Sequence, residues 1–119
     1  MKIRFALLIW LTFFTIAEAS PPNCNKNDVP TLVKPMANWD IIATNEGTID
    51  MAAVFSGNEL TYTVSAHPKN SKNKVTINKA TGIIQVKAER KDNFDVTVKV
   101  MNLCGTASNT FNVIIDEEE

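Results

Sequence analysis

The sequence predicts an all-β protein, a Greek-key antiparallel β-sandwich of about seven strands, on three observations. Apolar and polar residues alternate in short runs between Phe55 and Ile115, and a period of two is typical of strands buried on one face. Turn residues such as glycine and asparagine interrupt these runs at about every tenth position. No window of similar length in residues 20–119 has the i, i+3, i+4 apolar spacing of an amphipathic helix.

The first residues have the organisation of a secretory signal peptide. Two basic residues precede an apolar run from Phe5 to Ala17, and small residues flank Glu18, as signal peptidase requires. The apolar run has 13 residues, fewer than the roughly 20 of a membrane-spanning helix. We therefore expect residues 1–19 to be cleaved before Ser20, and the protein to be secreted, periplasmic or extracellular.

The remaining 100 residues are enough for one domain with a single core. They contain 10 basic and 12 acidic residues, a net charge of −2. This balance argues against nucleic acid as a partner, because nucleic-acid binding needs a concentrated basic surface. It also gives no electrostatic reason for binding to an anionic membrane.

Cys24 and Cys104 are the two cysteines, and both follow the predicted cleavage site. An even pair in an exported chain indicates a disulfide. Closing a loop of about 80 residues stabilises the fold by about 4–5 kcal/mol in the chain-entropy model. The rival interpretation is a metal site, but two thiols and the distant His67 do not make a set of four ligands. We therefore predict a Cys24–Cys104 disulfide.

The N-terminal part of the processed chain is expected to be irregular before the first strand. Residues 20–38 are rich in proline, asparagine and lysine, which predicts a lead-in that the disulfide holds in place. The sandwich is predicted over residues 39–116. Its first strand is expected at residues 39–44, followed by a turn at residues 45–47 and a second strand at residues 48–51.

The later strands are predicted from clear alternation. Residues 67–73 form the loop between the third and fourth strands, and residues 78–82 form the turn before the fifth. Gly82 lies where a hairpin commonly needs a positive φ angle. Cys104 falls in the turn between the last two strands. The inward-facing residues of the second to the last strand are Ile49 and Met51; Leu60, Tyr62 and Val64; Val75 and Ile77; Ile84, Val86 and Ala88; Phe94, Val96, Val98 and Val100; and Phe111, Val113 and Ile115.

Six segments resemble, in order and spacing, the pattern of one domain family. They carry a phenylalanine, a Leu-Thr-Tyr strand, an Ile-Asn…Thr-Gly hairpin, a Phe-x-Val-x-Val strand and a final Phe-x-Val strand. The segments are Ile49–Ser56, Leu60–Val64, Val75–Asn78, Ala80–Gln85, Phe94–Val100 and Phe111–Val113. On these residues the chain resembles the dystroglycan-type cadherin-like domains, also described as immunoglobulin-like domains of bacterial surface proteins. The resemblance implies a cadherin- or immunoglobulin-like sandwich with a role in cell adhesion or protein binding.

Departures from this family pattern concern calcium, which takes six to eight oxygen ligands. Asn102 stands where relatives have an aspartate, and Arg90 and Lys91 dilute a stretch that is acidic in them. The turn at residues 56–58 lacks the acidic residues often found there. The acidic tail, residues 117–119, is expected to be frayed and solvated. We therefore expect no calcium, no other metal and no cofactor.

The sequence contains no signature of an enzyme. The single histidine, His67, precedes Pro68 in a polar loop, and no nucleophile elbow, zinc-binding helix or phosphate loop occurs. Asp92 and Asp95 are close in sequence but are not expected to face each other. Catalysis needs a defined cluster of nucleophile, acid and base, so we predict a protein that is not an enzyme.

Four residues are candidate partner contacts. Lys69, Lys72 and Lys74 concentrate positive charge in the loop, and they either keep a hairpin tip soluble or contact an acidic glycan or protein. Trp39 is the only tryptophan left after cleavage. It either packs on the core or, if exposed, anchors a sugar ring or a protein.

The functional prediction is an exported binding or adhesion module that recognises a protein or a glycan at or outside the cell envelope. Strand edges, with their unpaired backbone groups, are one expected means of binding. Two alternatives remain at this point. One is an accessory structural subunit of an envelope or surface assembly. The other is a secreted protease inhibitor, to which only the residues 78–82 correspond.

Overall fold

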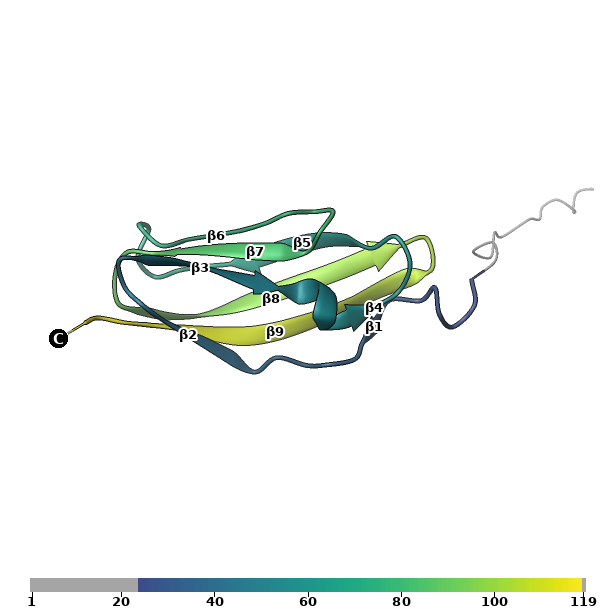
Figure 1. Ribbon diagram of the computed structural model, residues 1–119, viewed down its shortest axis with the longest axis horizontal. Helices are drawn as coiled ribbons and strands as arrows, with labels where there is room; N and C mark the ends of the chain where they lie inside the picture. The colour runs from purple at the N-terminus through teal and green to yellow at the C-terminus, as the bar shows by residue number, and fades with distance from the viewer. Residues whose placement is uncertain (1–23, 119) are drawn as a thin grey trace, which may run out of the picture.

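The computed structural model describes residues 24–118, which form a β-sandwich of two packed sheets (Figure 1). The predicted signal peptide, residues 1–19, lies outside the described residues. The elements in chain order are β1 (Thr31–Leu32), β2 (Asn38–Ile42), β3 (Asn45–Asp50), the 3-10 helix η3 (Met51–Ala53), β4 (Phe55–Ser56), β5 (Thr61–Ala66), β6 (Lys74–Ile77), β7 (Ile83–Ala88), β8 (Asp92–Asn102) and β9 (Gly105–Asp116).

One sheet has the strand order β2-β9-β8-β5, and the facing sheet has the order β3-β7-β6. The predicted β-sandwich is therefore confirmed. The prediction of about seven strands corresponds to the strands of these two sheets, and β1 and β4 add a separate two-stranded pair. The alternation pattern did not show β1 and β4, because each has two residues, too few for a period of two to be visible.

The expectation of a wholly antiparallel sandwich is wrong at one pair. Strand β2 runs parallel to β9, with Trp39 opposite Val113, whereas every other pair of strands in the described chain is antiparallel. The chain leaves β2 at once for the facing sheet, where β3 pairs with β7. Strand β2 therefore joins its sheet beside the last strand of the chain instead of beside a sequence neighbour.

The core lies between the sheets and is built from the inward residues of the alternating strands. Ile84, Val86 and Ala88 of β7 are fully buried, as are Val113 and Ile115 of β9. The predicted inward faces are confirmed for the strongly alternating strands β5, β7, β8 and β9. The buried apolar residues are Ala43, Ile49, Met51, Val54, Phe55, Tyr62, Ile84, Val86, Ala88, Phe94, Val96, Val98, Val100, Phe111, Val113 and Ile115.

The turn predicted at residues 45–47 is wrong, because those residues belong to β3. The chain turns earlier, at Thr44, whose φ angle is 71°. Gly47 serves packing instead of a turn: a β-carbon at this position would lie 2.6 Å from the indole of Trp39. Met51 is buried as predicted, but it begins η3 instead of ending a strand, and the carboxylate of Asp50 caps that helix at the N–H of Ala52, 3.0 Å away.

The lead-in is fixed to the end of the sandwich where β8 turns into β9. The predicted disulfide between Cys24 and Cys104 is present, with 5.8 Å between the two Cα atoms. The side-chain amide of Asn102 donates to the carbonyls of Asp28 (2.6 Å) and Asn58 (2.8 Å). One asparagine thus joins the lead-in, the turn before β5 and the end of β8.

Candidate functional site

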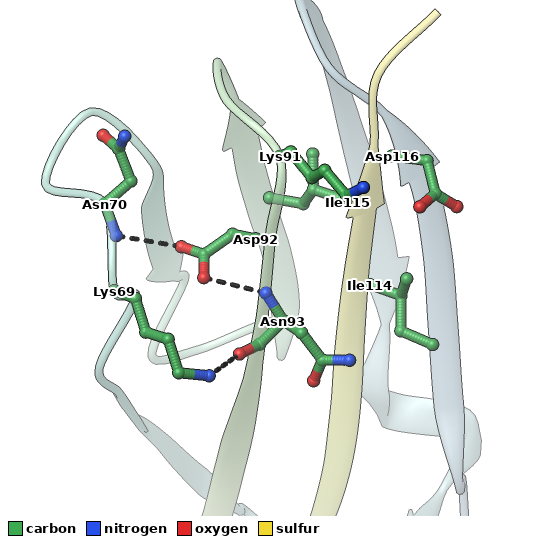
Figure 2. A pocket seen from close by; sticks show the side chains of 8 residues that line it. All are labelled: Lys69, Asn70, Lys91, Asp92, Asn93, Ile114, Ile115 and Asp116. Atoms are coloured by element: carbon green, nitrogen blue, oxygen red, sulfur yellow. Dashed lines mark hydrogen bonds between the residues drawn. The ribbon is translucent and has the colours of Figure 1, made fainter.

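A shallow depression of about 500 Å³ lies at the end of the sandwich opposite the disulfide. Three segments meet there: the loop between β5 and β6, the turn from β7 into β8, and the end of β9. Figure 2 shows the lining residues, which are Lys69, Asn70, Lys91, Asp92, Asn93, Ile114, Ile115 and Asp116. The pairing of Asp92 with Ile115 and of Asn93 with Ile114 places the start of β8 beside the end of β9.

Buried polar side chains hold these segments in position. Asn73 is 2% exposed, and its amide oxygen accepts from the backbone N–H groups of Glu89 (2.7 Å) and Arg90 (3.0 Å). Its amide nitrogen donates to the Asp92 carboxylate at 3.0 Å. The loop before β6 and the turn before β8 are therefore joined by one side chain.

The carboxylate of Asp92 is the second part of this network. It is 9% exposed and accepts from the backbone N–H groups of Asn70 (3.0 Å) and Asn93 (2.8 Å) as well as from Asn73. Burial by itself raises the pKa of the Asp92 carboxyl, but these hydrogen bonds outweigh it and lower the pKa below the ordinary value. Asp92 is therefore a charged structural acceptor, and its oxygens are already engaged.

The three lysines of the loop do not form one cluster. Lys69 lines the depression and donates from Nζ to the backbone carbonyl of Asn93 (Figure 2). Lys72 is exposed at the loop, and its backbone N–H donates to the side chain of Asn70 at 2.9 Å. Lys74 begins β6 and lies opposite Lys87 of β7. Both strands belong to the β3-β7-β6 sheet, whereas β5 belongs to the facing sheet.

Lys91 is the second lysine of the depression, and the sequence reasoning missed it as a contact. It lies 22 positions from Lys69 in the chain, and the charge of the turn from β7 into β8 was considered only as a departure from calcium binding. The positive charge of the site therefore comes from Lys69 and Lys91 together. No local pattern in the sequence shows that these two residues meet.

Trp39 does not line the depression. Its side chain is half-buried and packs against the core, with the ring end over Gly47. Of the two alternatives given for this residue, the structure favours packing. The contact also explains why a glycine is found in the middle of β3.

The depression combines side chains of both charges with polar and apolar ones. Its side chains provide two lysines, two carboxylates, two asparagines and the half-buried Ile114, while His67 is exposed in the neighbouring loop. Within residues 24–118, no group of three or more His, Cys, Asp or Glu side chains is arranged to hold a metal ion. In the same residues, no helix has the length and apolar character needed to cross a membrane.

No protein-family model and no curated protein matches the sequence. Among solved structures, the fold is similar to part of an α-galactosidase of Bacteroides fragilis, with a TM-score of 0.60 and 22% identity over 72% of this chain. The matched region is 17% of that enzyme, so the chain spans less than a fifth of its length.

Two smaller solved structures match over nearly their whole length. Titin domain M7 has a TM-score of 0.54 and 14% identity, covering 75% of this chain and 95% of the titin domain. A PKD domain solved in solution has a TM-score of 0.54 and 13% identity, covering 81% and 93% of the two chains. At these identities the likeness concerns the fold alone. The chain has an immunoglobulin-like β-sandwich fold, of the kind also found in PKD domains, and the dystroglycan-type family is not shown.

Proposed function

We propose that this chain is an exported, non-enzymatic binding module, and that its lysine-bearing end recognises an acidic group on a protein or a glycan. The observation that carries the proposal is the depression itself. The buried Asp92–Asn73 network joins the loop between β5 and β6 to the turn from β7 into β8. Strand pairing places the end of β9 beside them, and this leaves Lys69 and Lys91 at a preformed surface. A rigid surface of this kind binds without losing much conformational freedom.

Several features support this assignment over catalysis. Asp92 accepts from the backbone N–H groups of Asn70 and Asn93, and the side chain of Asn70 accepts from the backbone N–H of Lys72, so these polar groups of the depression stabilise its surface. The immunoglobulin-like and PKD-like neighbours are modules of the same architecture. The Cys24–Cys104 disulfide agrees with an oxidising compartment, and together with the signal peptide predicted from the sequence it supports export.

The test is a binding screen with matched charge variants. The disulfide-bonded protein is applied to a panel of acidic and neutral polysaccharides and to the surface and secreted proteins of the producing cell. Binding to an acidic ligand is expected to weaken with salt and to fall at least about tenfold in the double variant Lys69→Ser, Lys91→Ser. The control, Lys87→Ser with Lys99→Ser, removes the same charge from exposed strand positions and is expected to bind like the unmodified protein.

Two results contradict the proposal. Equal affinity of the two double variants for the captured ligand would show that the depression is not part of the binding surface. Preference for neutral ligands, without salt dependence, would show that the protein does not recognise an acidic group. Protease or glycosidase treatment of the captured material then tells whether the ligand is a protein or a glycan.

A second candidate function is that of an accessory structural subunit, and one structural comparison supports it. A domain of this fold forms a small part of the α-galactosidase chain, so the architecture also occurs built into a larger protein. This function predicts co-purification with a larger partner at fixed stoichiometry, unaffected by the lysine substitutions. The binding module predicts a dissociable complex that those substitutions weaken.

A further inference from the structure

The four edge strands of the two sheets differ in how they are protected against pairing with another strand. Three of them carry charged side chains: Asp40 in β2, Glu46 in β3 and Lys74 in β6. Strand β5 carries none, and no charged residue occurs in residues 60–68. Charged residues on an edge are a common defence against strand addition, so β5 is the undefended edge of these two sheets.

The exposed backbone of β5 is a short segment with two defined limits. The N–H of Tyr62 donates to the carbonyl of Lys79 at 3.0 Å, so every second residue of β5 turns its backbone groups away from β8. At this end the turn containing Lys79 occupies the edge. At the other end Pro68 has no N–H to donate. The open segment is therefore residues 63–67.

Within this segment Val64 and Ala66 follow Tyr62 by two and four positions. Their N–H and C=O groups therefore point away from β8, as those of Tyr62 do. Strand β5 pairs only with β8, and no described residue hydrogen-bonds to the outward groups of these two residues. Their side chains are half-buried and packed against the core, while Thr63 and Ser65 are exposed on the opposite face. An added strand must therefore have apolar side chains on its inward face and polar side chains on its outward face.

We propose that this edge pairs with the same edge of a second copy of the chain, about a two-fold axis at Ser65. Ser65 is the centre of the open segment, so both copies fit between the same two limits. Val64 then faces Ala66 of the second copy and exchanges two backbone hydrogen bonds with it. By symmetry, Ala66 exchanges two more with Val64 of the second copy. The two four-stranded sheets become one, with both apolar faces on the core side.

The second copy meets every requirement of the edge. It presents the same alternation in the same length, since antiparallel pairing about Ser65 places residues 63–67 of one copy along residues 67–63 of the other. No like charges face each other in the paired segment. The paired segment ends at residue 67, and the depression begins at Lys69. The dimer therefore does not require the depression to bind an acidic group, and this inference does not depend on the proposed function.

The first test measures mass against concentration by sedimentation with the disulfide-bonded protein. We expect a monomer at low micromolar concentration and a dimer near millimolar concentration. Ser65→Lys places two lysines opposite each other on the axis and is expected to raise the dissociation constant at least about tenfold. Thr106→Lys adds the same charge at an exposed position of the interior strand β9 and is expected to dimerise normally.

The second test fixes the register by cross-linking. Position 65 of the two copies forms a directly opposite, non-hydrogen-bonded pair with Cα atoms about 4.5 Å apart, within the range of a disulfide. Ser65→Cys is therefore expected to give a covalent dimer under mild oxidation. Thr63→Cys lies on the same strand and face, but its equivalents are about 14 Å apart, so it is expected to remain monomeric.

Three outcomes overturn the proposal. They are a monomer at all concentrations, equal dimerisation of Ser65→Lys and the unmodified protein, and equal cross-linking at positions 63 and 65. If the chain stays monomeric while Ser65→Lys abolishes capture of another protein, the edge accepts a foreign strand, and self-pairing is wrong. A thermal melt of each variant confirms that the exposed substitutions leave the fold intact.

Discussion

Asp92 shows how a single buried side chain can decide the shape of a surface loop. Its carboxylate joins the loop before β6 to the start of β8 through Asn70 and Asn73. Hydrogen bonds to a charged group are stronger than those to a neutral one, so the network needs the ionised form. The lysine-bearing depression therefore depends on a residue that the sequence analysis considered only as a catalytic carboxylate.

The pH dependence of stability follows from this network. The pKa of Asp92 lies below its ordinary value of 3.8 in the folded protein, so its stabilising contribution is complete above that pH and is lost as the pH falls through the folded value. Asp92→Asn is expected to lower the free energy of unfolding by about 1–3 kcal/mol at pH 7. Urea unfolding of the variant and of the unmodified protein should show this difference shrinking as the solution is acidified.

The control for Asp92 is Asp116→Asn, which removes the same charge from an exposed end of β9. It is expected to change the unfolding free energy at pH 7 by less than about 0.5 kcal/mol. Equal losses in the two variants, or a difference that grows in acid, would show that Asp92 does not hold the loop through its charge.

Gly82 is the residue at which the turn and the core meet. Its φ angle is +77°, and a β-carbon would lie 2.7 Å from the ring of Tyr62. Gly82→Ala is expected to lower the free energy of unfolding by at least about 1–2 kcal/mol from the backbone alone, and by more because Tyr62 must move. Lys79→Ala, in the same turn and exposed, should stay within about 0.5 kcal/mol in the same denaturation experiment.

At the scale of elements, the lead-in is held in place mainly by its bonds to the rest of the domain. It contains one two-residue strand, β1, and is tied to the rest by the disulfide and by the amide of Asn102. A disulfide with a sequence separation of 80 residues restricts the unfolded chain strongly. Covalent closure therefore replaces part of the packing that a longer first strand would provide.

Removal of the disulfide tests this account. The variant Cys24→Ser, Cys104→Ser is expected to lose about 2–4 kcal/mol in the free energy of unfolding, measured by urea denaturation. Reducing the unmodified protein should give the same loss. A loss below about 1 kcal/mol, outside the usual range for such a loop, would show that the lead-in is ordered by its other contacts.

Element prediction succeeded where the signal was local. The strands β5, β7, β8 and β9 follow from alternation alone, because one face of each is buried. The turn at Thr44 was placed too late, because Asn45 and Gly47 are common turn residues and their strand role depends on distant partners. Gly47 lies in β3 to make room for Trp39, a contact that no local rule predicts.

For the whole molecule, the expectation that calcium does not bind agrees with the hydrogen bonds at the disulfide end of the sandwich. The amide of Asn102 donates to the carbonyl oxygens of Asp28 and Asn58, and the side chain of Asn58 donates to the Asp28 carboxylate at 2.5 Å. These oxygens already accept hydrogen bonds from N–H groups, which compete with a cation for them.

A thermal melt checks this expectation. Addition of millimolar calcium or of a chelator is expected to leave the midpoint unchanged, because a ligand that binds only the folded state raises it. A clear rise with calcium would show a site at this end or at the acidic tail. Asn102→Asp would then locate the site, since a strengthened response would place it at this end.

By itself the sequence determined the class of fold, the inward face of each long strand, the turn at Gly82 and the pairing of Cys24 with Cys104. These properties are local, or follow from there being two cysteines. Only the tertiary structure decided that β2 runs parallel to β9, that Lys91 joins Lys69 while Lys74 moves to the other sheet, and that β5 is left as an uncharged edge. The order in which strands pair decides which loops meet and which edges stay open, and alternation within a strand carries no record of its neighbours.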